Sequence, residues 1–263
     1  AYFANAVKLE PANPVYRYHY GNALLEAQKS AEALVEYQKA AELKPDYLDA
    51  LFQRGLANNK KGNHDLAIAD YTQGITLSPA DSQFWYNRGI AQYDKGNLEY
   101  ALADYNQAIK LNPNYMKAFV NRGAVYYKKK LFDMAVVELT TAIKLDPNNA
   151  EAWGNRGMSY SALNQLDLAL ADYSEAVRVN PKYAKGYLDR AIAYNNKRQN
   201  DLAIADLNQA IGLDPYVQVE GLGCGVGGFR DQRARDTVGL DPVPPRRHLG
   251  RVRQSERLGV LDA

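Results

Sequence analysis

Proline recurs in this chain at a strict interval of 34 residues. The series runs without insertion or deletion and consists of Pro11, Pro45, Pro79, Pro113, Pro147, Pro181 and Pro215. Two further series keep the same interval, one of small residues that begins at Gly21 and one of alanines that begins at Ala33. A period of this length indicates a repeat protein, because one unit of this size cannot bury its own apolar face and must stack on its neighbours.

Each repeat contains the apolar pattern of two helices. In residues 82–115, Trp85 and Gly89 lie on one stripe with helical spacing, and Ala101 and Tyr105 belong to a second stripe. The small residues allow the two backbones to approach closely, and the large ones fill the space around them. Pro113 ends the second helix, because proline has no amide hydrogen and restricts the residue before it. We therefore expect each repeat to be a helical hairpin.

The turn within each hairpin places one residue where a left-handed backbone is expected. Glycine fills this position at Gly62 and Gly96, and Asn164 also tolerates the conformation. Lys130 and Arg198 adopt it less readily because of their Cβ atoms. We expect the two turns that contain them to be strained or to have a different shape.

Taken together, these positions resemble the pattern of the tetratricopeptide repeat family. Residues 150–183 match its characteristic positions with Trp153, Gly157, Ala169, Tyr173, Ala176 and Pro181. Six full repeats begin at Pro14, Leu48, Ser82, Met116, Ala150 and Ala184, after a partial repeat at residues 1–13. The resemblance covers residues 1–217. It implies an all-α fold, a right-handed superhelical solenoid of antiparallel helix-turn-helix repeats with a concave groove lined by the first helices.

Arginine occupies the seventh position of five repeats, and each arginine has an acidic residue sixteen positions later. The arginines are Arg54, Arg88, Arg122, Arg156 and Arg190, and the acids are Asp70, Asp104, Glu138, Asp172 and Asp206. Because every arginine has its own acid, we interpret them as ion pairs within each repeat rather than as an anion-binding row. The first full repeat has Tyr20 at this position and keeps Glu36, so we expect it to lack the pair.

The family resemblance places the sixth position of each repeat in the concave groove. In relatives that resemble O-linked N-acetylglucosamine transferase, asparagines there hold the backbone of an extended peptide, since an amide both donates and accepts. The candidates here are Asn87, Asn121 and Asn155, with Gln53 as a substitute, whereas His19 and Asp189 depart from the pattern. Other positions that face the groove in the family contain Phe52, Tyr86, Tyr93, Lys117, Tyr127 and Lys128, together with Met158 and Lys185. The alternative is that these residues form solvated helix faces, with asparagine simply the common residue of the family.

The sequence gives little support for catalysis. The histidines are His19, His64 and His248, and none lies near a cysteine or at metal-ligand spacing. We therefore predict no active site, no metal site and no cofactor, and we do not expect the chain to be an enzyme. Chaperone-binding relatives clamp a C-terminal carboxylate with lysines and asparagines, and those positions are incomplete here, which disfavours that class of ligand.

The charge balance disfavours other classes of partner. A net charge of +2 is too small to attract nucleic acid or an anionic membrane from a distance. No apolar run approaches the length of a membrane span, and the first residues lack the pattern of a signal peptide. The single cysteine, Cys224, cannot form an intramolecular disulfide, which suits a cytoplasmic location.

Residues 218–263 have a different composition, rich in glycine and arginine and without lysine or tyrosine. We expect this tail to be disordered, either as a natural extension or as out-of-frame translation. Gly223, Gly225 and Gly228 satisfy G-x-G-x-x-G, but too few residues follow for a nucleotide-binding domain. Because no capping helix is recognisable after the last repeat, self-association through that end is a further expectation.

These features favour a non-catalytic scaffold that binds an extended segment of a partner protein in its concave groove. Two alternatives stay open. The repeats could be the substrate-recruiting arm of a larger enzyme such as a glycosyltransferase, or they could form an architectural or oligomerisation module.

Overall fold

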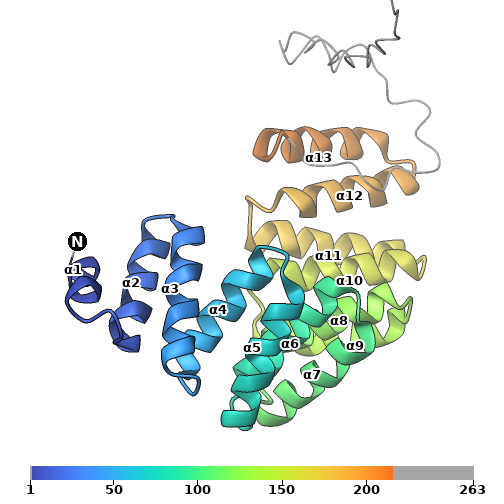
Figure 1. Ribbon diagram of the computed structural model, residues 1–263. Coiled ribbons are helices and arrows are strands. Elements are labelled where there is room, and N and C mark those ends of the chain that lie inside the picture. The colour runs from blue at the N-terminus through green and yellow to red at the C-terminus, as the bar shows by residue number, and fades with distance from the viewer. Residues whose placement is uncertain (1, 216–263) are drawn as a thin grey trace, which may run out of the picture. The chain divides into compact units, whose positions relative to one another are not determined.

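The computed structural model describes residues 2–215, and all regular structure in this part is helical (Figure 1). Its thirteen helices are α1 (Tyr2–Leu9), α2 (Pro14–Glu26), α3 (Ser30–Leu43), α4 (Leu48–Lys60), α5 (His64–Leu77), α6 (Ser82–Lys95), α7 (Leu98–Leu111), α8 (Met116–Lys128), α9 (Phe132–Leu145), α10 (Ala150–Ala162), α11 (Leu166–Val179), α12 (Ala184–Asn196) and α13 (Asn200–Leu213). The predicted all-α class is confirmed. The tail at residues 218–263, with its glycine motif, Cys224 and His248, lies outside the described residues.

Consecutive helices pair as hairpins. The even-numbered helices from α2 to α12 are the first helices of six repeats, and the odd-numbered helices from α3 to α13 are their second helices. Local signals set the ends of these helices. The Asn13 side chain caps α2 by accepting from the backbone nitrogens of Val15 and Tyr16. At the other end of a hairpin, α7 stops at Leu111, two residues before Pro113.

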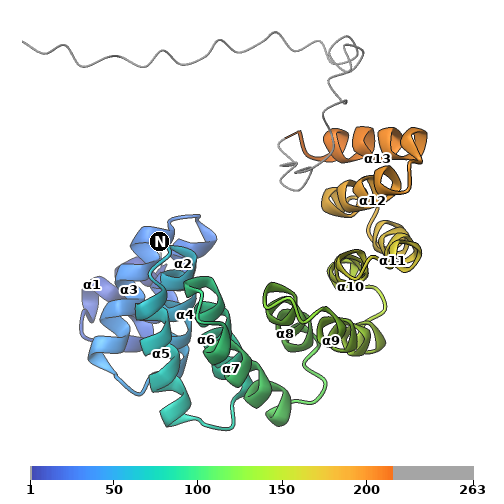
Figure 2. The same cartoon turned by 90° about the vertical axis from the view of Figure 1, so that its right-hand side faces the viewer.

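The hairpins stack in chain order, which is visible as the sequence of colours in Figures 1 and 2. Each second helix packs on its own first helix, and from α3 to α11 also on the first helix of the next repeat. The first helices contact one another from α4 through α12, whereas the second helices of residues 2–215 have no comparable contacts among themselves. The first helices therefore share one side of the stack, the side where the family resemblance puts the groove.

The core of a hairpin consists of a small residue on the first helix and a large one on the second. Tyr71 and Tyr105 are buried, and a Cβ atom added to Gly55 or Gly89 would lie 2.6 or 2.7 Å from their rings. A contact this short is incompatible with close packing, so the passage of the ring beneath the first helix requires glycine there.

The hairpin turns contain a residue with positive φ. This angle is 60–61° at Gln28, Lys130, Asn164 and Arg198, and it is 86° at Gly62 and 90° at Gly96. The turns at Lys130 and Arg198 therefore have the same local conformation as the turn at Asn164, and a different shape is not observed. The other part of the prediction, strain in these two turns, depends on the conformational cost that a Cβ atom has in the left-handed region.

Candidate peptide-binding site

The five predicted ion pairs are present, each between the two helices of one repeat. The nitrogen–oxygen distances are 2.5 Å for Arg54–Asp70, 2.7 Å for Arg88–Asp104, 2.5 Å for Arg122–Glu138, 2.8 Å for Arg156–Asp172 and 2.7 Å for Arg190–Asp206. Burial raises the pKa of the Asp70 and Asp104 carboxyls, although the arginine hydrogen bonds oppose that shift. Every one of these guanidinium groups is thus engaged by its own acid, which gives it a structural role.

The same guanidinium groups also join consecutive repeats, a role not anticipated from the sequence. Arg88 Nη1 donates to Thr72 Oγ1 of the preceding repeat at 3.0 Å, and Arg122 Nη1 donates to Asn106 Oδ1 at 2.6 Å. The equivalent bonds in the next two repeats are Arg156–Thr140 and Arg190–Ser174. A signal for these contacts exists in the sequence, because a polar residue stands sixteen positions before each of these arginines.

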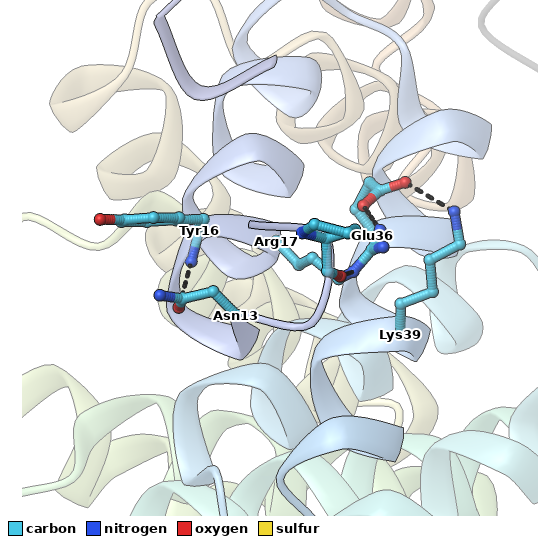
Figure 3. A network of polar contacts seen from close by, with 6 residues as sticks. Asn13, Tyr16, Arg17, Glu36 and Lys39 are labelled. Carbon is cyan, nitrogen blue, oxygen red and sulfur yellow. Dashed lines mark hydrogen bonds and ion pairs between the residues drawn. The ribbon is translucent and has the colours of Figure 1, made fainter. Parts of the chain in front are cut away.

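The first full repeat has an ion pair of its own, so the prediction that it lacks one is wrong (Figure 3). Arg17 of α2 donates from Nη1 to Glu36 Oε2 of α3 at 2.8 Å. Lys39 binds the other Glu36 oxygen at 3.0 Å. Arg17 can replace the missing arginine because it lies three residues before Tyr20, on the same face of the helix.

Four of the predicted recognition residues line one hollow on the first-helix side of the stack. They are Tyr93 of α6, Tyr127 and Lys128 of α8, and Asn155 of α10, around a cavity of about 350 Å³. Met158 of α10 and Lys185 of α12 also line this hollow. It therefore extends over four consecutive first helices, and its volume is in the range of pockets that hold small ligands.

The polar groups around the hollow differ in how far they are already engaged. The Lys128 ammonium lies 4.7 Å from the centre of the Tyr93 ring, whereas Lys185 forms an ion pair with Asp189 at 2.8 Å. Burial raises the pKa of the Asp189 carboxyl, and Lys185 partly opposes this shift. Burial and the Asp189 charge also raise the pKa of Tyr127, so its hydroxyl remains protonated at neutral pH. The hollow offers a cation and hydrogen-bond donors beside apolar surface.

The three asparagines of the predicted ladder have different environments. Asn121 donates to the Tyr86 hydroxyl at 3.1 Å, and Asn87 donates to the backbone oxygen of Gln83 in its own helix at 2.8 Å. The Asn155 side chain has no hydrogen-bond partner within residues 2–215. Of the three, Asn155 therefore presents an amide that is available to a ligand.

The remaining predicted residues lie outside the hollow. Gln53 lines a separate cavity of about 430 Å³ with residues of α2 and α3. Phe52 packs edge-on against Phe84 of the next repeat, with ring centroids 5.4 Å apart. Burial raises the pKa of Tyr86 to about 12, and Lys117 is exposed on α8. Phe52 and Tyr86 thus contribute to the packing of the stack.

Within residues 2–215, no group of histidine, cysteine and acidic side chains is arranged to hold a metal ion. None of the helices in the same range is long and apolar enough to cross a membrane.

Family models for the tetratricopeptide repeat match consecutive stretches of the chain. A TPR repeat model matches residues 21–62, 58–96 and 91–130, and two tetratricopeptide repeat models match residues 117–149, 150–183 and 184–216. Together these matches extend across residues 21–216, and the chain belongs to the tetratricopeptide repeat (TPR) family. Proteins of this family generally mediate protein–protein interactions and are usually non-catalytic. No curated protein sequence matches the chain.

Solved structures of other proteins have the same fold. The Cut9–Hcn1 hetero-tetramer of the APC/C matches with a TM-score of 0.69 and 22% identity over 81% of this chain, which spans only 42% of the matched chain. The structure of pilF from Pseudomonas aeruginosa matches with a TM-score of 0.65 and 18% identity, over 77% of this chain and 92% of that one. YrrB, a TPR protein with an unusual peptide-binding site, matches with a TM-score of 0.57 and 20% identity, over 74% and 97% of the two chains.

Proposed function

We propose that the chain is a protein-binding scaffold that holds an extended segment of a partner protein against its first helices. The observation that carries this proposal is the hollow, where four residues selected by repeat position line one cavity. Its aromatic walls bury a large area at low entropic cost. The Asn155 amide and the Lys128 ammonium, which has no acidic partner within residues 2–215, add polar recognition.

The combination suits a peptide better than a small polar metabolite. A peptide backbone requires both a donor and an acceptor, which one amide supplies, and its side chains require apolar surface beside the polar groups. Two solved structures with the same fold support peptide binding by analogy, since YrrB has a peptide-binding site and Cut9 is in a complex with Hcn1.

Selection from a library of random peptides displayed on phage tests this proposal with the full chain as bait. The affinities of the selected peptides are then measured by fluorescence anisotropy. We expect Tyr127→Ala to weaken binding by roughly tenfold or more, because it removes an aromatic wall of the hollow. The matched control is Tyr100→Ala, which removes a tyrosine that is 67% exposed on the second helix α7 and should leave binding unchanged.

A second pair of variants tests the role of charge. Lys128→Glu reverses a charge at the hollow, and Lys110→Glu makes the same change at an exposed position of α7. We expect only the first to alter the affinity for the selected peptides. Melting temperatures measured in parallel separate lost binding from lost folding. If the folded Tyr127→Ala and Lys128→Glu variants bind the peptides as the wild type does, the hollow is not the binding site.

A further inference from the structure

The second helix of each repeat has a large residue beneath the first helix, and this residue is aromatic in four repeats. In successive repeats the position contains Tyr37, Tyr71, Tyr105, Leu139, Tyr173 and Leu207. Where it is tyrosine, the ring passes close to the glycine of the first helix, and a Cβ atom on Gly157 would lie 2.7 Å from the Tyr173 ring. Beside Gly123 the nearest atoms belong to Leu139, which is shorter than tyrosine and has no hydroxyl. In the fourth repeat the chain therefore does not fill the space that a tyrosine side chain fills in the first, second, third and fifth repeats.

The hollow lies at this point of the stack. Gly123, Ala124 and Leu139 all line it, together with the recognition residues of α6 and α10. Leu139 itself is fully buried and packs in a core cluster with Phe119 and Ala135. The cavity is therefore bounded by a well-packed leucine, and its volume is not the result of a poorly packed core.

Asn155 is the amide that a tyrosine at this point would meet. In the preceding junction, the equivalent residue Asn121 donates to a tyrosine hydroxyl, that of Tyr86, at 3.1 Å. At the next junction, Val120 stands at the position of Tyr86 and Leu139 at that of Tyr105, so neither residue offers a hydroxyl to Asn155. This relation explains why the Asn155 side chain lines the cavity without a hydrogen-bond partner in residues 2–215.

The walls of the cavity also suit an aromatic ring. Tyr93 and Tyr127 line it from α6 and α8, and Met158 adds a thioether from α10. Aromatic pairs and sulfur–aromatic contacts both favour a ring over an aliphatic side chain. Lys128 already rests near the Tyr93 ring, and its ammonium can interact with an incoming ring in the same way.

We propose that this cavity receives a tyrosine side chain of the bound partner segment, whose hydroxyl forms a hydrogen bond with Asn155. The inference rests on the proposed function and names the side chain that the hollow recognises. The ring occupies the volume that the chain's own tyrosines occupy in other repeats. Tyrosine is preferred over phenylalanine, because phenylalanine leaves the half-buried Asn155 side chain without a partner.

N-acetyl-tyrosinamide is a minimal probe for this cavity. We titrate it into the 15N-labelled full chain and follow the amide resonances by NMR. We expect saturable shifts at Gly123 and Asn155, and binding of N-acetyl-leucinamide that is weaker by roughly tenfold. Leu139→Tyr fills the cavity from within the chain and should abolish these shifts. Leu207→Tyr makes the same substitution in the last repeat and should leave them unchanged.

A second variant addresses the hydrogen bond. In wild type, N-acetyl-tyrosinamide should bind roughly tenfold more tightly than N-acetyl-phenylalaninamide. Asn155→Ala should bring the two affinities together. If Leu139→Tyr fails to fold, as judged by its melting temperature, equal binding of N-acetyl-tyrosinamide and N-acetyl-phenylalaninamide by wild type overturns the inference.

Two further outcomes overturn the inference. One is equal binding of tyrosinamide and leucinamide by wild type, and the other is unchanged binding of tyrosinamide by folded Leu139→Tyr. Failure of the proposed function has a different signature. In that case N-acetyl-tyrosinamide would still saturate the cavity, but Tyr127→Ala would not change the affinity of the library-selected peptides. Peptides that need Tyr127 but bind normally to Leu139→Tyr contradict the inference alone.

Discussion

The buried tyrosines of the repeats differ in the environment of a single atom. Tyr37 donates to Asn22 Oδ1 at 2.7 Å, whereas the buried Tyr71 hydroxyl has no hydrogen-bond partner among residues 2–215. The sequence explains this difference, because Leu56 replaces Asn22 in the next repeat and Asn87 donates to its own helix instead. A buried hydroxyl stabilises the fold when it is paired and destabilises it when it is not.

Removal of the two hydroxyl groups is expected to have opposite effects. Tyr71→Phe should raise the free energy of unfolding by about 1 kcal/mol, since it removes an unpaired polar atom. Tyr37→Phe should lower it by about 1 kcal/mol, because Asn22 then loses its partner. Urea unfolding of both variants beside wild type measures the two changes. Equal destabilisation by both substitutions would mean that the Tyr71 hydroxyl has a partner.

For individual residues, the sequence predicts which side chains share a helix face but not which of them are free to bind a ligand. Repeat position makes Asn87, Asn121 and Asn155 equivalent, yet only Asn155 has an unpaired amide in the described part of the chain. The difference depends on contacts between repeats, such as the one between Asn121 and Tyr86. A periodic pattern averages over the repeats and so conceals an individual departure such as Leu139.

At the scale of elements, the junction of α5 and α6 contains two departures from the repeat pattern that compensate each other. Phe84 stands where several other repeats have alanine, and Gly74 stands where the other second helices have alanine. Phe84 is 2% exposed, and a Cβ atom on Gly74 would lie 2.2 Å from its ring. The large residue therefore occupies space that the small one leaves open.

A double-mutant cycle is expected to reveal this coupling. Gly74→Ala should destabilise the protein by about 1–3 kcal/mol through overpacking. Phe84→Ala alone should cost about 3–5 kcal/mol, because it leaves a cavity. In the double variant the alanine pair restores the common packing, so the total cost should fall below the sum by at least about 1 kcal/mol. Strict additivity in denaturant unfolding would contradict the proposed compensation.

The hairpins could be predicted from the sequence because their determinants are local. Pro113 lies just after α7, and Gly89 and Tyr105 belong to the two helices of one repeat. The pairing of Gly74 with Phe84 is harder to predict, since it joins neighbouring repeats and each departure taken alone resembles a packing defect.

Across the whole stack, a lysine–acid ion pair joins several consecutive repeats but not the fourth and fifth, which both line the hollow. Lysines near the end of a first helix pair with acids in the preceding repeat at Lys95–Asp65, Lys129–Glu99 and Lys197–Asp167. Between the fourth and fifth repeats, Leu163 takes the place of the lysine opposite Asp133. Exposed pairs of this kind contribute little individually. A segment bound in the hollow would contact both the fourth and the fifth repeat, which are not joined by this pair.

Under the proposed function, an extended partner segment binds along the first helices α6, α8, α10 and α12, which line the hollow. The most direct test is a crystal structure of the full chain with a library-selected peptide. We expect peptide density along the first helices from α6 to α12, with a tyrosine side chain over Leu139 and its hydroxyl at hydrogen-bonding distance from the Asn155 amide. Peptide density on the second helices, with the cavity beside Leu139 left empty, would contradict it.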